Sequence, residues 1–528
     1  MVHLSLLCPE VPVSSTVAPL TWSRVEPGSG QPLPPCDPVD PQAAGAAVSR
    51  ARAARESWEH LGVRERGRLL LAWRDAIVRD REGLADLLAR ENGKPRADAL
   101  TELLGACDFL VHAARKAPAY LRDRPLVAPN PLLRHVRTRL VHRAKGVVGI
   151  ISPWNYPCLL PMASIVPALA AGNTVVLKPS EWTPRIALRL VELAHGAGIP
   201  SAVLQVLPGD RELGKALVEA GVDHVCFTGS VASGRRVAAA CAERLVTCTL
   251  ELGGKDAALV MPDADLDFAA RGIVWAAMVN AGQVCASVER VLVLPDQAGP
   301  LLERLEHHLR ALRVGSWDEP GVDVGPMIGP WQRDTVVRHV TEALAAGARV
   351  RAGGRVLDRP GCFHEPTLLE GVTPDMTVWR EETFGPVLPV LVVPDLDTMV
   401  REANDTEYGL SATVWGRDLD RAEAIARRLE VGTAWVNTAL DTYGNPVTPR
   451  GGLKSSGIGR IGGDDGFAPF VTTRVVDVQA HGRVSPVWFP ATAGLDQFLS
   501  AGLALFHGAS PWERLRAAVT ALRNWPRP

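Results

Sequence analysis

Three residues that lie far apart in the sequence carry side chains that could act on one substrate: Cys285, Glu251 and Asn155. Cys285 follows an expected helix and precedes the expected strand 288–294. Its thiol is a candidate nucleophile, although a lone cysteine is more often a small buried apolar residue. Taken alone, Cys285 leaves both interpretations open.

Glu251 ends an expected strand and is followed by Gly253-Gly254-Lys255, where the backbone can bend tightly. A carboxylate at the carboxyl end of a parallel strand faces the crevice in which such sheets bind ligands. The alternative is a structural salt bridge between Glu251 and Lys255. Asn155 stands in a loop with two prolines and could donate an amide hydrogen bond, or it could cap the next helix.

One segment could hold a phosphate, and several common site types are excluded. Phe227-Thr-Gly-Ser230 opens an expected helix after a strand, where backbone N–H groups and the helix dipole favour an anion. The sequence contains no G-x-S-x-G, no G-x-x-x-x-G-K-[ST] and no C-x-x-C, and the adjacent pair His307-His308 cannot share one helix face. We therefore expect neither a nucleophile-elbow hydrolase nor a P-loop enzyme, and we expect no metal site.

The elements that must position these residues alternate between strands and helices. Three amphipathic stretches near 41–61, 64–92 and 97–119 predict helices. From Val147 onward, short β-branched runs alternate with helical segments, which indicates βαβ units and parallel sheets covered on both faces. The alternation resumes after Gly254, which leaves room for a second α/β domain. The expected strands lie at 147–152, 174–178, 203–207, 224–228, 247–251, 257–261, 288–294, 387–393, 411–416 and 433–437.

Composition limits the partners and the compartment. Lys and Arg total 57 against 58 for Asp and Glu, a net charge of −1, so no basic field favours a nucleic acid. The nine cysteines are scattered, which suits reduced thiols in the cytoplasm. The amino terminus lacks a basic n-region and does not resemble a secretory signal. No run of 18 apolar residues occurs, so we expect no integral membrane contact.

The two ends of the chain differ from the middle. Residues 9–40 are rich in Pro, Ser and Gly and predict an extended arm. In the tail, Trp512, Leu515, Val519 and Leu522 form one apolar stripe on a helix that also carries arginines. Such a helix can make peripheral contact with a membrane surface. The interpretation that we favour is a helix docked on its own subunit or on a neighbour.

Taken together, the motifs resemble those of the aldehyde dehydrogenase superfamily from about residue 35 to residue 480. Within the superfamily, 145–157 and 287–290 look most like the succinate-semialdehyde dehydrogenase-like branch. The motifs that carry the resemblance are Pro153-Trp-Asn-Tyr-Pro157, Lys178-Pro-Ser-Glu181, Phe227-Thr-Gly-Ser230, Glu251-Leu-Gly-Gly-Lys255, Asn280-Ala-Gly-Gln-Val-Cys285, Glu381-Glu-Thr-Phe-Gly-Pro-Val387 and Gly451-Gly-Leu-Lys-Ser-Ser-Gly-Ile-Gly-Arg460.

The resemblance implies an NAD(P)-dependent oxidation of an aldehyde to a carboxylic acid through a cysteine thiohemiacetal and thioester. Cys285 would be the nucleophile, the Asn155 amide would hold the oxyanion, and Glu251 would activate water. Members that transfer the acyl group to CoA lack such a glutamate, so Glu251 favours hydrolysis. A CoA-acylating relative and a non-catalytic member of the superfamily are the rival functions.

The resemblance also implies a coenzyme site. We expect NAD with NADP as the alternative, because Glu181 should accept a hydrogen bond from the ribose 2′-OH and repel a 2′-phosphate. The residues expected at the coenzyme are Ser152, Pro153, Trp154, Lys178, Ser180, Glu181, Gly209, Thr228, Gly229, Ser230, Leu252, Glu382 and Phe384.

The expected fold is α/β and aldehyde dehydrogenase-like, with two doubly wound parallel-sheet domains and a small oligomerisation part. The NAD-binding domain would comprise 1–127 and 146–252, and the catalytic domain 253–455. Segments 128–145 and 470–483 would join subunits in a homodimer or homotetramer. Residues 484–528 would be a C-terminal extension.

Three departures from the family pattern concern individual positions. Arg211 stands where many members have glycine, and Ile461 stands where many members have glutamate. Arg450 occupies a position that is usually apolar. Arg450 could read the carboxylate of a short semialdehyde such as succinic semialdehyde, or it could face solvent or pair with Asp441 or Asp465. An aromatic or medium-chain aldehyde is the alternative substrate.

Overall fold

The structure is a computed structural model of the 528-residue chain, and it describes residues 24–130, 133–482, 485, 487–490 and 493–524. The amino-terminal segment judged not to be a secretory signal, and the first part of the expected extended arm, lie outside these residues. The chain forms two compact units, one up to Tyr120 together with Ala144–Val471, and one comprising Leu121–Arg143 and the residues from Thr472 onward.

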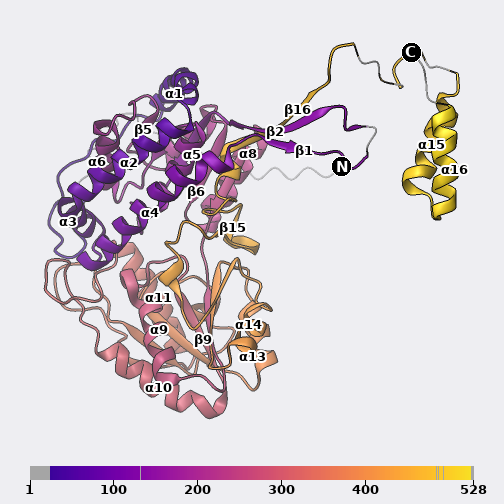
Figure 1. Ribbon diagram of the computed structural model, residues 1–528. Coiled ribbons are helices and arrows are strands. Elements are labelled where there is room, and N and C mark those ends of the chain that lie inside the picture. Colours follow the sequence, from indigo (N-terminus) through magenta and orange to yellow (C-terminus); the bar gives the residue numbers. More distant parts are fainter. Residues whose placement is uncertain (1–23, 131–132, 483–484, 486, 491–492, 525–528) are drawn as a thin grey trace, which may run out of the picture. The chain divides into compact units, whose positions relative to one another are not determined.

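The first unit begins with four helices (Figure 1), α1 (Ala43–His60), α2 (Val63–Arg79), α3 (Arg81–Asn92) and α4 (Arg96–Tyr120). The single helix expected over 64–92 is therefore two helices. The backbone of Asp80 has φ −96° and ψ 11°, which ends α2 and lets α3 start at a new angle. Gly93 ends α3 in the left-handed region that glycine adopts without strain.

The first sheet has six strands in the order β15-β7-β6-β3-β4-β5. Its strands β3 to β7 run parallel, and only β15 is antiparallel. Neighbouring strands in the sequence diverge at β3, so the sheet has a switch point there, where open α/β sheets bind ligands. The elements are β3 (Val147–Ile151), α5 (Leu159–Ala171), β4 (Thr174–Lys178), α6 (Pro184–Gly196), β5 (Leu204–Val206), α7 (Arg211–Glu219), β6 (His224–Thr228), α8 (Val231–Glu243), β7 (Thr247–Glu251) and β15 (Gly457–Ile458).

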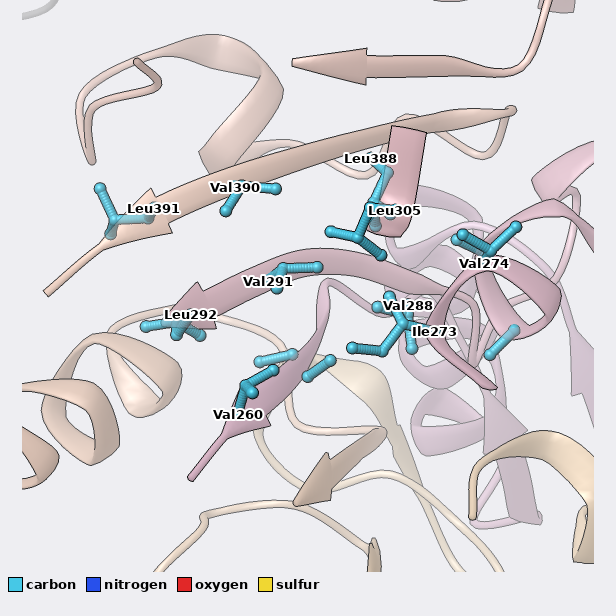
Figure 2. Packing of buried hydrophobic residues seen from close by; sticks show 14 of the residues in the cluster. Val260, Ile273, Val274, Val288, Val291, Leu292, Leu305, Leu388, Val390 and Leu391 are labelled. Carbon is cyan, nitrogen blue, oxygen red and sulfur yellow. The ribbon is translucent and has the colours of Figure 1, made fainter. Parts of the chain in front are cut away.

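The second sheet has seven strands in the order β10-β11-β12-β9-β8-β13-β14. Strands β8, β9 and β12 are buried on both faces by apolar side chains such as Val260, Val291 and Val390 (Figure 2). The elements are β8 (Asp256–Val260), α9 (Leu266–Met278), β9 (Val288–Val293), α10 (Pro295–Arg310), α11 (Pro330–Ala345), β10 (Arg349–Ala352), β11 (Thr367–Glu370), α12 (Thr377–Arg380), β12 (Val387–Val392), α13 (Leu396–Asn404), β13 (Ser411–Trp415), α14 (Leu419–Ala426) and β14 (Thr433–Val436).

The second unit contains a three-stranded sheet and a helical hairpin. The sheet has the order β1-β2-β16, with β1 (Arg124–Leu126), β2 (Arg137–Ala144) and β16 (Val471–Val478). The hairpin pairs α15 (Leu495–His507) with α16 (Pro511–Arg523) through Phe498, Ala501 and Ala521.

The predicted apolar stripe on α16 does not form this contact. Its side chains, from Trp512 to Leu522, are 45–74% exposed, whereas Ala517 and Ala521 are buried. Small residues thus make the packing face of α16, and the large apolar residues lie on another face. Among the described residues, no helix is both long enough and apolar enough to cross a membrane.

Candidate active site

Cys285 stands in a turn with an unusual backbone. Between α9 and β9, Asn280, Ala281 and Gly282 adopt φ values of 52°, 55° and 71°. Side-chain-bearing residues rarely adopt this region, and such strain persists only where surrounding contacts enforce it. A Cβ on Gly282 would lie 2.3 Å from the carbonyl oxygen of Gly385, so the close approach of two backbones requires glycine here.

A buried hydrogen-bond network enforces the turn and includes Asn155. The Asn155 amide Nδ2 donates to the carbonyl of Gln283 at 3.0 Å, and the Asn155 carbonyl accepts from Asn280 Nδ2 at 3.0 Å. Lys94 Nζ donates to the same carbonyl at 2.8 Å and pairs with Glu102 at 2.6 Å. Asn155 therefore contacts the turn before Cys285, and the alternative that it caps the next helix is wrong.

The thiol of Cys285 lies 3.7 Å from the hydroxyl of Tyr443. Burial raises the pKa of Cys285 to about 12, while the Tyr443 hydroxyl acts in the opposite direction. The thiol is therefore protonated at neutral pH, and it needs a proton acceptor or bound substrate and coenzyme before it can act as a thiolate.

Glu251 ends β7 next to this turn and carries an unpaired carboxyl. Its Oε1 is buried without a hydrogen-bond partner in the described residues. Burial raises the pKa of Glu251 to about 8, and the charges of Arg450 and Arg460 lower it. The alternative salt bridge to Lys255 is wrong, because Lys255 pairs with Glu289 at 2.6 Å. A carboxyl that titrates near neutral pH without a structural partner is suited to proton transfer.

Arg450 is buried, and its guanidinium lies 4.4 Å from the centre of the Tyr443 ring. Its backbone pairs with Ile461 in both directions at 2.7 Å, and its Nε has no partner in the described residues. No described carboxylate lies within ion-pair distance of it, so the alternatives that Arg450 faces solvent or pairs with Asp441 or Asp465 are wrong. The Asp441 carboxylate instead accepts from the Thr438 hydroxyl.

Two cavities meet at Cys285. The larger has a volume of about 430 Å³ and extends along α4, and Cys285 is one of its lining residues. Its other lining residues are Asp98, Thr101, Glu102, Leu104, Gly105, Asp108, Tyr156, Leu159, Leu160, Trp275, Val279, Val284, Leu440, Asp441, Tyr443, Gly444, Asn445 and Pro446. Arg450 does not line this cavity.

The second cavity, of about 230 Å³, contains both Cys285 and Glu251. Glu382 forms part of its wall, where its carboxylate accepts from the Gly254 N–H at 3.1 Å, and burial raises the pKa of Glu382 to about 8. A Cβ on Gly253 would lie 2.3 Å from Glu382, so glycine leaves room for this side chain. Pro153, Trp154, Asn155, Thr228, Gly229, Ser230, Leu252, Gly253, Trp331, Gln332, Thr335, Thr383 and Phe384 complete the lining.

A third cavity, of about 350 Å³, is also lined in part by the first turn of α8. Lys178 and Glu181 line it, and their charged groups are 3.4 Å apart. Ser230 and Ser233 of the same helical turn line the second and third cavities respectively, and Ser230 caps α8 by accepting from the Ser233 N–H. The first turn of α8, whose amino terminus favours an anion, therefore contributes to both cavities.

The structure thus brings together ten of the thirteen expected coenzyme residues, in two cavities. Ser152, Ser180 and Gly209 line neither cavity. Ser180 instead caps a turn by accepting from the Trp182 N–H, and Ser152 has a buried hydroxyl without a partner in the described residues. A Cβ on Gly209 would lie 2.1 Å from Leu213, so glycine there permits close packing of the loop on α7.

Sequence reasoning missed several lining residues. Lys215 and Arg236 line the third cavity together with Arg211, which was noted only as a departure from the family pattern. On α4, the residues that line the largest cavity recur at helical spacing, including Asp98, Glu102 and Asp108. Acidic residues on one face of a helix whose other residues pack in the core were the available signal.

Comparison with known proteins identifies the family. The model of the aldehyde dehydrogenase family matches residues 17–476. The chain is 39% identical over 437 residues to a Mycolicibacterium smegmatis protein named putative succinate-semialdehyde dehydrogenase [NADP(+)]. The alignment covers 82% of this chain and 83% of that protein. This chain belongs to the aldehyde dehydrogenase family. A Mycobacterium tuberculosis protein with a similar name is 38% identical over 451 residues, 85% of this chain and 86% of that protein.

Solved structures support the same assignment. An NAD-dependent aldehyde dehydrogenase from Sinorhizobium meliloti aligns with a TM-score of 0.85 at 37% identity, covering 89% of this chain and 93% of that one. Lactaldehyde dehydrogenase from Escherichia coli aligns with a TM-score of 0.84 at 31% identity, covering 87% and 96%. The predicted family, α/β fold and reaction class are confirmed: the chain is an aldehyde dehydrogenase that uses NAD or NADP.

Proposed function

We propose that this chain oxidises an aldehyde to a free carboxylic acid, with Cys285 as nucleophile and Glu251 as the base for hydrolysis. The observation that carries the proposal is the position of Cys285 in both cavities, one for the aldehyde and one for the nicotinamide end of the coenzyme. Glu251 lines the second cavity with Cys285 and has a carboxyl oxygen without a partner.

Each residue has a defined part in this proposal. When substrate and coenzyme are bound, the Cys285 thiol gives its proton to water and its sulfur attacks the carbonyl carbon. The second N–H of the Asn155 amide, together with the Cys285 backbone N–H, stabilises the oxyanion. When bound, the nicotinamide coenzyme would supply the hydride acceptor, and the residues that line the second cavity would hold it beside Cys285. The carboxylate of Glu251 then removes a proton from water, which attacks the thioester and releases the acid and the thiol.

Formation of reduced coenzyme from an aldehyde, with and without CoA, tests this function. We expect turnover without CoA and the free acid as the product. Turnover that requires CoA, with an acyl-CoA as the product, would favour the CoA-acylating alternative. No reduction of NAD or NADP by any aldehyde of a broad panel would favour the non-catalytic alternative.

We propose further that the coenzyme site accepts NADP in preference to NAD, which reverses the expectation based on Glu181 alone. Lys178, Arg211, Lys215 and Arg236 line the third cavity against two carboxylates, those of Glu181 and Glu212. Arg211 pairs with Glu212, Lys215 with Glu219 and Lys178 with Glu181, so Arg236, which forms no ion pair with a described residue, is the cation that favours a 2′-phosphate. The printed NADP(+) names of the relatives also support NADP, whereas the Sinorhizobium meliloti structure is named for NAD.

The ratio of kcat/KM for NADP to that for NAD tests this preference. We expect Arg236→Ala to lower the ratio by about tenfold, because one charge-assisted contact is worth roughly 1.5 kcal/mol. Arg417→Ala, which removes an exposed arginine outside the three cavities, is the matched control and should leave the ratio unchanged. A wild-type ratio that favours NAD would contradict the proposal.

Succinic semialdehyde is the substrate suggested by the names of the relatives and by the motifs at 145–157 and 287–290. Arg450 gives it no direct support, because Arg450 is outside the largest cavity. The short semialdehyde is therefore a candidate because of similarity alone. The charged residues that line the 430 Å³ cavity are a separate indication of the substrate.

We also propose how the parts of the chain divide the work. The six-stranded sheet would serve the coenzyme, the seven-stranded sheet would carry Cys285, and β2 and β16 would join subunits in a homodimer or homotetramer. Exposed apolar residues on β16, such as Val475 and Val476, support a partner there. Peripheral membrane contact by the exposed stripe on α16 remains an expectation. The unpaired thiols of the described cysteines support a cytoplasmic location.

A further inference from the structure

The charge of the largest cavity is one-sided. Four carboxylates line it, those of Asp98, Glu102, Asp108 and Asp441, and no lysine, arginine or histidine does. Glu102 is compensated, because it pairs with the buried Lys94 at 2.6 Å and also accepts from the N–H groups of Cys158 and Leu159. The other three carboxylates form no ion pair with any described residue, so three unpaired negative charges line the cavity that also contains Cys285.

Asp98 lies deepest of the three, since it is half-buried while Asp108 and Asp441 are exposed. Its Oδ2 accepts from the backbone N–H of Asn280 at 3.2 Å, which fixes the side chain beside the turn that precedes Cys285. Burial raises the pKa of Asp98 to about 6, and the charge of Lys94 lowers it. Asp98 is therefore ionised at neutral pH.

The basic residues near the cavity do not line it. His112, Arg115 and Lys116 line a separate shallow hollow that shares Asp108 with the cavity, and Lys116 pairs with Asp464 at 3.0 Å. Lys94 contacts the face of the Tyr156 ring at 4.0 Å and is saturated by Glu102 and the Asn155 carbonyl. Arg115 of the hollow and Arg450, which contacts the Tyr443 ring at 4.4 Å, form no ion pair with a described residue, but neither of them lines the cavity.

We propose that this cavity selects aldehydes whose far end is a cation, such as a substituted ammonium group, over neutral and anionic aldehydes. Three carboxylates without an ion pair attract an ammonium group and repel a carboxylate, and a low-dielectric wall strengthens both effects. Trp275 also lines the cavity and is 43% exposed, and an aromatic ring attracts a cation placed over its face. The inference rests on the proposed function and names its substrate class.

A pair of aldehydes of equal shape tests the selection. The cation is 4-(trimethylammonio)butanal, and its neutral counterpart is 5,5-dimethylhexanal, in which carbon replaces the charged nitrogen. In the wild type we expect kcat/KM for the cation to exceed that for the neutral aldehyde by at least about tenfold. The reason is that partly buried carboxylates attract the ammonium group of the cation. Succinic semialdehyde, the anionic arm, should be used less well than the neutral aldehyde.

Variants show whether the carboxylates cause the preference. Asp98→Asn keeps an oxygen that accepts from Asn280 and removes only the charge, and we expect it to lower the cation-to-neutral ratio by about threefold or more. Asp108→Asn should lower the ratio by a smaller factor, because Asp108 is exposed. Asp296→Asn, which removes an exposed charge in the first turn of α10, is the control and should keep the wild-type ratio.

Two results would overturn the inference: a wild-type ratio at or below one, or a ratio that Asp98→Asn and Asp108→Asn both leave unchanged. Either result can occur while 5,5-dimethylhexanal is oxidised, and then the proposed function survives alone. If no aldehyde reduces the coenzyme, the proposed function and the inference fail together.

Discussion

Arg450→Met is the substitution whose effect on the chemistry follows most directly from the structure. The buried guanidinium contacts Tyr443, and its charge is the largest factor that lowers the pKa of Glu251, which burial raises to about 8. An opposite charge near a carboxyl group typically lowers its pKa by about 1 unit or more. Removing the charge should therefore raise the pKa of Glu251 from about 8 to about 9. Methionine can fill the space beside the ring without a charge.

The expected fall in the rate of hydrolysis follows from the ionised fraction of Glu251. At about pH 7.5 this fraction falls from roughly a quarter to roughly three per cent, so a hydrolysis step that needs the carboxylate slows about eightfold. At about pH 10 both proteins are almost fully ionised at Glu251 and should turn over at similar rates.

The assay is kcat as a function of pH for the wild type and Arg450→Met at saturating aldehyde and coenzyme. A burst of reduced coenzyme in the first turnover establishes that hydrolysis limits the rate. Arg417→Met is a control that removes an exposed guanidinium outside the cavities. An unchanged midpoint in Arg450→Met would refute the reasoning that Arg450 sets the pKa of the base.

Two further predictions concern the base and the support of the turn. Glu251→Gln should retain the first-turnover burst and lower steady-state kcat by about a hundredfold or more, because acylation does not need the carboxylate and hydrolysis does; loss of the burst in a folded variant that binds coenzyme would contradict this. Lys94→Met should lower the free energy of unfolding by about 3–5 kcal/mol, because it leaves the buried Glu102 carboxylate unpaired. Lys215→Met, which breaks an exposed pair with Glu219, should change it by less than about 1 kcal/mol, and denaturant unfolding measures both.

The sequence predicted most of the buried parallel strands and predicted the edges of the sheets poorly. The buried parallel strand β11 (Thr367–Glu370) was missed, because it is only four residues long. Strands such as β3 and β9 are continuous β-branched runs, so their length and apolar character suffice to locate them. Strand β10 (Arg349–Ala352) was missed, because a short edge strand with two arginines has no such pattern. The break at Asp80 was missed because the apolar spacing continues across it.

The candidate site shows a similar division. Motifs singled out Cys285, Glu251 and Asn155 as candidates, and the structure places all three in the lining of the second cavity. Contacts between segments that are distant in the sequence could not be predicted from spacing. Lys255 forms its ion pair with Glu289 and not with Glu251, and the guanidinium of Arg450 lies over the Tyr443 ring. The charge of the largest cavity was also hidden, since its carboxylates come from α4 and from the segment around Asp441, more than three hundred residues apart.

The covalent role of Cys285 is the central claim, and the mass of a trapped intermediate tests it most directly. Glu251→Gln mixed with an aldehyde and coenzyme should gain the mass of one acyl group per chain, located on the peptide that contains Cys285. The double variant with Cys285→Ala should gain none. An acyl group on another of the nine cysteines, or equal labelling of the double variant, would contradict the account.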